Sequence, residues 1–281
     1  MLRVLDAGWR AAAYCLHPKV ILLSLLPLLL MGAVALGMGW LFWDAAVQAT
    51  WGWLQSWGLF AWLGEWLQGL VLGGLGTVVA PLVVVLLAMP VIVVASLVAV
   101  AVLMTPALVR LVGERRFPQL QRRHGASLLT SIGWSLGSTL LALVAFVLTL
   151  PLWLIPPLVL VLPPLIWGWL AYRVMSFDAL AEHATPAERR LVLRRHRMPL
   201  LGIGIVTGYL GAAPGIVWAS GALFAAAFVV LVPLAIWIYT VVFAFSSLWF
   251  AHYCLAALQA LRAEPLEVPA RSVASRDEHP S

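Results

Sequence analysis

The sequence predicts an all-α membrane protein with two long transmembrane helices, two proline-containing helical hairpins that insert fully or partly, and amphipathic interfacial helices. Three observations predict this class. Hydrophobic residues make up 63% of the 281 positions and charged residues only 10%, whereas soluble domains carry roughly 25% charged residues. Apolar tracts alternate with short arginine-rich segments, as is typical of membrane spans joined by cytoplasmic loops. Prolines interrupt the later tracts at positions suited to turns.

The first predicted span covers residues 20–43, which contain no charged residue and are long enough to cross a bilayer as a tilted helix. A cleaved signal peptide is the alternative, but the run is too long for the hydrophobic region of such a peptide. No lysine or arginine occurs between Lys19 and Arg110, so residues 44–67 are expected on the outer side. Because this segment is rich in tryptophan, it predicts an amphipathic helix in the outer interface.

The second predicted span covers residues 69–108 and leads into a cluster of arginines. Arginines mark the cytoplasmic side, so this tract must bring the chain back inside, and its length suits a single crossing. Pro81 and Pro90 are candidate kinks within it.

Two hairpins are predicted at residues 128–171 and 200–256. Arginines flank each tract at both ends, which places the two ends of a tract on the same side of the membrane. Helix-breaking prolines inside a tract favour a turn there. The expected turn residues are Pro151, Pro156 and Pro157 in the first tract, and Pro214 and Pro233 in the second.

Two shorter helices are expected outside the apolar tracts. Residues 2–17 carry apolar side chains at helical spacing and predict a helix lying in the plane of the interface. Residues 185–198 predict a short cytoplasmic helix, because Thr185 and Glu188 form a capping box around Pro186 at its start.

These elements together predict one integral membrane domain over residues 1–262, with both termini in the cytoplasm. Residues 263–281 are expected to form a disordered cytoplasmic tail, because they contain prolines and few hydrophobic residues.

Several classes of function are disfavoured by the sequence. No glycine-rich phosphate loop with Lys and Ser or Thr and no metal-ligand spacing occurs, so we expect neither a cofactor nor a metal, and no enzyme. His252 and Cys254 are two positions apart and therefore face different sides of a helix, which excludes them as a nucleophile pair. The arginines flank apolar tracts, so membrane lipids rather than nucleic acid are the expected partners.

Transport is the favoured class of function. The absence of acidic residues from the apolar tracts indicates which type of transport to expect. Ion-coupled carriers usually hold a charged or titratable residue at mid-membrane. The deep polar groups here are hydroxyls instead. An uncoupled channel or permease is therefore favoured over a proton-driven pump. The alternative is a non-transporting scaffold that organises lipids or the envelope.

Four stretches of the chain occur in an order that resembles the CysZ/etoposide-induced-protein family of bacterial inner-membrane proteins, over residues 1 to about 260. The stretches are HPKVILLSLLPLLL (residues 17–30), MTPALVRLVGERRF (104–117), LTLPLWLIPP (148–157) and FDALAEHATPAERRLVLRRHRMPLLGIGI (177–205).

Members of that family are sulfate permeases built from two full spans and two partly inserted hairpins, and they assemble as oligomers. The resemblance therefore implies a homo-oligomer that lets a small oxyanion, sulfate first, pass through the bacterial inner membrane. In the family, the proline that opens the first span is followed by Gly-Leu-Arg-Arg, and Gly-Leu-Arg binds sulfate. Here Pro18 is followed by Lys19, Val20, Ile21 and Leu22.

Two sets of basic residues are the candidate sites. A dianion needs N–H donors and a positive field, so Lys19 and the amides after Pro18 form the first candidate, with arginines at the cytoplasmic mouth. The second set lies on the predicted helix 185–198 and is expected to face anionic headgroups. The mouth residues are Arg10, Arg110, Arg115 and Arg173, and the headgroup-facing residues are Arg189, Arg190, Arg194, Arg195 and Arg197.

Overall fold

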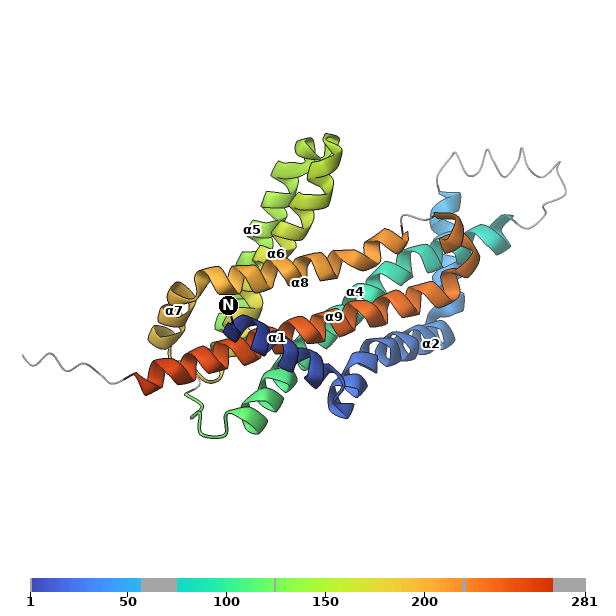
Figure 1. Cartoon of the computed structure of the whole chain (residues 1–281). Coiled ribbons are helices and arrows are strands. Elements are labelled where there is room, and N and C mark those ends of the chain that lie inside the picture. Colours follow the sequence, from blue (N-terminus) through green and yellow to red (C-terminus); the bar gives the residue numbers. More distant parts are fainter. Residues whose placement is uncertain (1, 57–74, 124, 219–220, 265–281) are drawn as a thin grey trace, which may run out of the picture.

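A computed structural model of the chain describes residues 2–56, 75–123, 125–218 and 221–264. Within these ranges every regular element is helical and no strand occurs, which confirms the all-α class. Figure 1 shows the arrangement. The elements are α1 (Leu2–Cys15), α2 (Pro18–Gln55), α4 (Leu75–Arg116), α5 (Leu128–Thr149), the 3-10 helix η1 (Leu150–Leu154), α6 (Pro156–Ala181), α7 (Pro186–Arg195), α8 (Arg197–Trp218) and α9 (Gly221–Ala263).

Four segments of the described chain are long and apolar enough to cross a membrane, which confirms a multi-pass membrane protein. Where the second span was predicted, the structure has one unbroken helix, α4, that continues through Pro81 and Pro90. The four segments are Pro18–Gln55, Leu129–Leu154, Pro156–Ala181 and Pro233–Ala263.

The core lies around the second half of α9, against which α1, α2, α4, α6, α7 and α8 all pack. Phe250, Leu255 and Leu258 of α9 have no exposed surface, and neither do Met104 and Leu108 of α4. Of the most apolar part of α9, 44% is buried inside the protein. A helix this enclosed is stabilised by contacts with other helices rather than by lipid.

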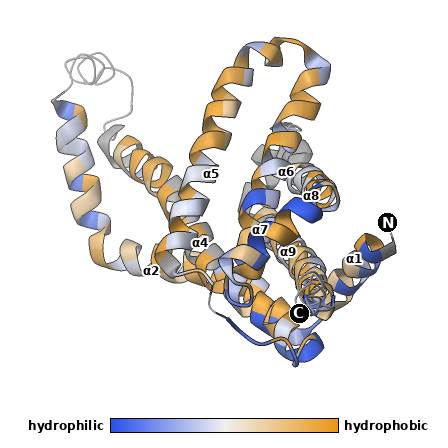
Figure 2. Cartoon of the chain, turned by 90° about the vertical axis from the view of Figure 1, so that its left-hand side faces the viewer, coloured by the Kyte–Doolittle hydropathy of each residue, from blue (hydrophilic) through white to orange (hydrophobic). Residues whose placement is uncertain are grey.

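The first hairpin, formed by α5, η1 and α6, projects from the rest of the helices (Figure 1). Ser127 caps α5 by accepting a hydrogen bond from the backbone N–H of Thr130 at 3.2 Å. The 3-10 helix forms the tip, and Pro156 occupies the first position of α6, where proline is favoured. Both arms are coloured mostly as hydrophobic in Figure 2. The predicted proline-tipped hairpin is therefore confirmed.

Helices α6 and α8 cross at glycines. A β-carbon at Gly204 or Gly208 would overlap with the backbone oxygen of Gly168 or Pro164, respectively. Small residues of this kind let two helix backbones approach closely, and such contacts are a main source of helix association in membranes. The crossing joins the base of the first hairpin to the second hairpin.

Three details of the sequence prediction need correction or lie outside the described residues. The second hairpin does not turn at its prolines, because α8 continues through Pro214 and α9 through Pro233. Proline is tolerated within membrane helices, where neighbouring groups satisfy the freed backbone oxygens. The predicted interfacial helix at 44–67 is instead the end of α2 as far as Gln55, and its remainder lies outside the described residues, as does the predicted tail from residue 265 onward.

Candidate functional site at the arginine-rich end

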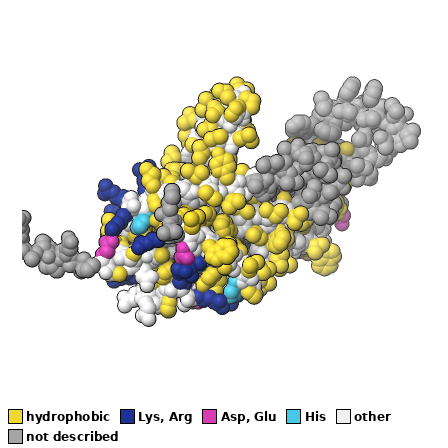
Figure 3. Space-filling view, viewed as in Figure 1, with side chains coloured by type: hydrophobic (Ala, Val, Ile, Leu, Met, Phe, Trp, Pro, Cys, Tyr) yellow, Lys and Arg dark blue, Asp and Glu magenta, His cyan; other side chains and the backbone are white. Residues whose placement is uncertain are grey.

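Basic side chains gather at one end of the molecule, where α7 and the last turns of α4 and α9 lie (Figure 3). This end is the candidate functional site, because the described membrane-spanning surfaces are predominantly apolar. Three features of it bear on function: a buried hub of ion pairs, a small cleft, and arginines that lack an acidic partner.

The hub is centred on Glu188 and Arg262. One carboxylate oxygen of Glu188 accepts hydrogen bonds from Arg262 Nε at 3.0 Å and Arg123 Nη1 at 3.1 Å. The other oxygen accepts from Arg262 Nη2 at 3.1 Å and from the backbone N–H of Thr185 at 2.8 Å. These bonds, those to the Arg262 guanidinium foremost, lower the pKa of Glu188 to about 2.

Arg262 also fixes two loops. Its Nη1 donates to the backbone oxygen of Gln121 at 3.1 Å, and its Nη2 donates to that of His183 at 2.7 Å. One guanidinium therefore holds the end of α9 against the α4–α5 loop and the α6–α7 loop. With four acceptors around a side chain only 18% exposed, Arg262 is a structural residue rather than a free anion ligand.

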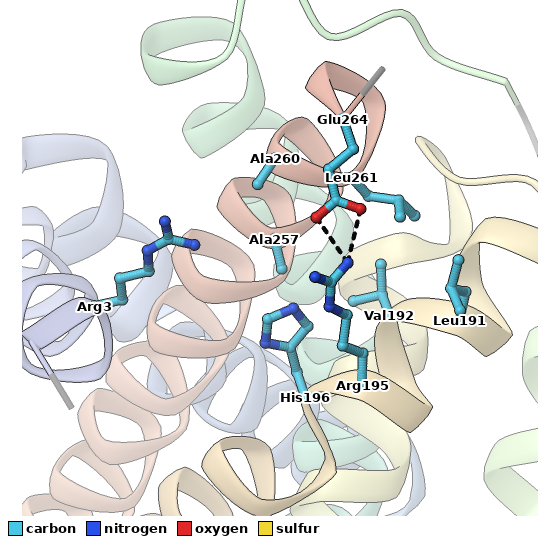
Figure 4. A pocket seen from close by; sticks show the side chains of 9 residues that line it. All are labelled: Arg3, Leu191, Val192, Arg195, His196, Ala257, Ala260, Leu261 and Glu264. Carbon is cyan, nitrogen blue, oxygen red and sulfur yellow. Dashed lines mark hydrogen bonds and ion pairs between the residues drawn. The ribbon is translucent and has the colours of Figure 1, made fainter. Parts of the chain in front are cut away.

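The cleft has a volume of about 70 Å³ and lies between α1, α7 and the end of α9. Figure 4 shows the Glu264 carboxylate meeting Arg195 Nη1 at 2.7 and 2.8 Å, with His196 beside the pair and Arg3 reaching in from α1. Burial, together with the positive charges of Arg195 and Arg3, lowers the pKa of His196. The cationic side chains of this cleft therefore already have a carboxylate beside them, that of Glu264.

The predicted mouth residues have different partners. Arg10 pairs with Asp6 at 2.9 Å, and Arg110 pairs with Glu182 at 3.3 Å. Arg115 is exposed in the last turn of α4, and no ion pair to it occurs within the described residues. Lys19 is exposed at the start of α2, where its backbone N–H donates to Nδ1 of the capping His17 at 3.2 Å.

Arg173 differs from the others in its surroundings. Its guanidinium carbon lies 4.1 Å from the centre of the Trp134 ring and 5.6 Å from that of Trp169. Its Nε is enclosed and has no hydrogen-bond partner. No carboxylate among the described residues pairs with it.

The predicted basic helix is α7 with its capping box intact, since Thr185 Oγ1 accepts from the Glu188 N–H at 3.3 Å. Its arginines divide into two groups. Arg189 is buried, lies 4.2 Å above the Phe177 ring, and donates to the Gly125 backbone oxygen at 3.4 Å. The exposed members are Arg190, Arg194, Arg195 and Arg197, of which only Arg195 forms an ion pair with a described residue.

The family model described as "Sulfate transporter CysZ/Etoposide-induced protein 2.4" matches residues 7–220, which is most of the chain. The chain belongs to this family. No curated protein and no solved structure matches it. The suspected membership is confirmed, and the matched residues include α1, α2 and the first hairpin of this CysZ/etoposide-induced-protein member.

Sequence reasoning missed two features of this family member. The capping box identified Glu188, but Arg262 is 74 residues away and no local pattern links them. His252 was considered only beside Cys254. It is buried against Tyr14 with ring centres 4.8 Å apart, and neither ring nitrogen has a hydrogen-bond partner among the described residues. No group of three or more metal-ligating side chains occurs among the described residues.

Proposed function

We propose that this protein is a passive permease for a small oxyanion, sulfate first, in the bacterial inner membrane. The observation that carries the proposal is the family match over residues 7–220, whose description names a sulfate transporter. The protein is proposed to act as a homo-oligomer, with membrane lipids as its other partners, and not as an enzyme. Both termini are proposed to lie in the cytoplasm, since positive loops favour that side.

Three hydroxyls within the described spans are bonded to their own helices, which agrees with uncoupled passage. Thr207 donates to the Gly204 oxygen at 3.0 Å, Thr240 to that of Ile236 at 2.8 Å, and Ser246 to that of Val242 at 2.7 Å. The hydrogen bonds to their own helices account for the hydroxyl protons without a coupling ion.

The solute-binding residues are proposed to be Lys19 with the amides at the start of α2, and the four arginines of the mouth. An exposed ammonium and a helix N-terminus both favour an anion. Because Arg10 and Arg110 are paired with carboxylates, Lys19 and Arg115 are the members of the set most available to an incoming anion.

The test is uptake of radiolabelled sulfate into liposomes that contain the purified protein. We expect saturable uptake above that of empty liposomes and its loss in Lys19→Ala. Arg194→Gln is the matched control, because it removes one exposed positive charge that has no partner among the described residues. Uptake no greater than in empty liposomes would reject the sulfate permease.

A scaffold role is the second candidate, and the exposed arginines of α7 and the start of α8 favour it. Arg190, Arg194 and Arg197 carry positive charge that no described carboxylate neutralises, as a surface resting on anionic lipid would. Replacing all three by glutamine is expected to weaken binding to anionic liposomes. If this variant keeps sulfate uptake, headgroup binding and transport are separate properties. If the wild type binds lipid and gives no flux, the scaffold role replaces transport.

A further inference from the structure

The base of the first hairpin holds a guanidinium that has aromatic neighbours but no acidic one. Trp134 of α5 lies between two side chains of α6: the Arg173 guanidinium is 4.1 Å from its ring centre, and the Phe177 ring stacks on it at 5.2 Å. The Trp134 indole N–H donates to the Arg173 backbone oxygen at 3.0 Å, which fixes the ring. Trp169 approaches the same guanidinium from a position one helical turn away.

This arrangement leaves only part of the guanidinium available. Nε is enclosed and unpaired, while the two terminal nitrogens reach the surface without a hydrogen-bond acceptor from the described residues. Aromatic faces stabilise a guanidinium but do not accept its in-plane N–H donors. The terminal nitrogens of the fork therefore have no hydrogen-bond partner among the described residues.

The Arg173 fork differs from the other partly buried arginines of this end. Arg189 also lies on a ring, that of Phe177, but it donates to the Gly125 oxygen. Arg262 has four acceptors. Arg173 alone among these three lacks any acceptor within the described residues. An acceptor from outside the chain would therefore complete the hydrogen bonding of its guanidinium.

The position along the hairpin suggests what that acceptor is. Arg173 lies about 12 Å from the end of α6 at Ala181, and Trp134 about 9 Å from the start of α5 at Leu128, by the rise of an α-helix. Large apolar residues of α5 are exposed nearby, since Leu129 and Ile132 are 82% and 61% exposed. Tryptophan and arginine at the edge of an apolar, lipid-facing surface are typical of headgroup depth.

We propose that the Arg173 fork, clamped by Trp134 and Trp169, binds the phosphate of an anionic phospholipid headgroup. A phosphate offers several oxygens to a planar, charged donor pair, so the bond is charge-assisted and suits arginine better than lysine. This assignment takes Arg173 out of the proposed solute-binding set and leaves Lys19, Arg10, Arg110 and Arg115 in that set. Sulfate offers the same tetrahedral oxygens, so the test must separate a bound lipid from a free oxyanion.

The experiment is native mass spectrometry of the purified protein titrated with phosphatidylglycerol or, in parallel, phosphatidylcholine. We expect the wild type to bind phosphatidylglycerol preferentially, and Arg173→Gln to bind it about tenfold more weakly, as the loss of a charge-assisted pair of hydrogen bonds implies. Arg3→Gln, which removes an exposed charge of α1 that has no ion pair among the described residues, should bind phosphatidylglycerol like the wild type. Equal binding by Arg173→Gln and the wild type would overturn the proposal.

Two further measurements complete the experiment. Arg173→Lys keeps the charge and the aliphatic stem but not the planar fork. It should therefore fold even if glutamine disturbs the base of the hairpin, and it should bind about threefold more weakly than the wild type. Binding of phosphatidylglycerol by Arg173→Lys at wild-type strength would contradict a fork-specific site. In the second measurement, the lipid-free protein is heated with sodium sulfate or sodium chloride. Sulfate protection that depends on Arg173 would identify a free oxyanion as the ligand and overturn the lipid assignment.

Discussion

The two hairpins have similar hydrophobicity but opposite surroundings. In the first, only 11% of the most apolar part of each arm is buried inside the protein, whereas in α9 the corresponding figure is 44%. Leu140 of α5 is 61% exposed, while Phe250 of α9 has no exposed surface. The first hairpin is therefore stabilised largely by what surrounds the protein, and the second by the protein itself. Hydrophobicity alone does not distinguish the two, because lipid and protein interior are equally apolar.

The largest difference between the hairpins is expected from truncating one large side chain in each. Phe250→Ala should lower the free energy of unfolding by about 3 kcal/mol, because it leaves a cavity in the core. Leu140→Ala should change it by less than about 0.5 kcal/mol, since lipid fills the space. Unfolding by denaturing detergent, followed by circular dichroism, measures both. Equal losses would show that the exposed arm is covered by protein in the assembled state.

The contribution of the α6–α8 crossing to stability can be tested with a matched pair of variants. Gly204→Ala should destabilise by about 2 kcal/mol, because the new methyl group meets the Gly168 backbone. Gly202→Ala, two positions earlier on the same helix, meets nothing within 4 Å and should be neutral or slightly stabilising. The same detergent titration measures both variants. The crossing would not matter for stability if Gly204→Ala and Gly202→Ala gave the same value.

A smaller effect is expected at the hub that holds α9 to the loops. Arg262→Gln leaves Glu188, whose side chain is 17% exposed, with fewer donors and should lower the melting temperature. The free energy of unfolding should fall by about 1–2 kcal/mol and not more, because Arg123 and the Thr185 N–H still reach the carboxylate. Arg194→Gln removes an exposed charge and should leave the melting temperature unchanged. A stable Arg262→Gln protein would mean that the packing of α9, and not the hub, positions the loops.

The smallest expected effect is a pH dependence of stability. The pKa of Glu188 is lowered from 4.5 to about 2 in the folded protein, mainly by the hydrogen bonds from Arg262. The lowered pKa means that its stabilisation is complete above about pH 4.5 and is lost as the pH falls toward 2. Melting temperatures measured across that window should fall less steeply in Glu188→Gln than in the wild type. Parallel curves for the two proteins would contradict the lowered pKa of Glu188 as the source of the pH dependence.

Much of the fold follows from local patterns, and the errors have physical causes. The prolines at the first hairpin tip predicted a turn correctly, because Pro156 occupies a helix start. Pro214 and Pro233 carry the same signal, yet α8 and α9 continue through them. In a membrane helix one missing N–H can be tolerated, so proline alone does not mark a turn.

The site was predictable only where its parts are close in sequence. Thr185 and Glu188 are three residues apart, and their capping box is present as predicted. The Arg262–Glu188 pair and the contact of Trp134 with Arg173 join distant segments, and only the folded chain brings these partners together. The predicted mouth arginines have different partners in the structure, which charge patterning could not predict because it indicates a side of the membrane and not individual contacts.

The central claim is passive passage of sulfate, and the most direct measurement is the final level of sulfate inside protein-containing liposomes, with and without imposed proton and sodium gradients. With the membrane potential held at zero, a permease without coupling is predicted to fill the liposomes to the outside concentration in every case, with a faster approach than in empty liposomes. Accumulation above the outside concentration under either gradient would contradict passive transport. A filling rate equal to that of empty liposomes would contradict sulfate permeation altogether.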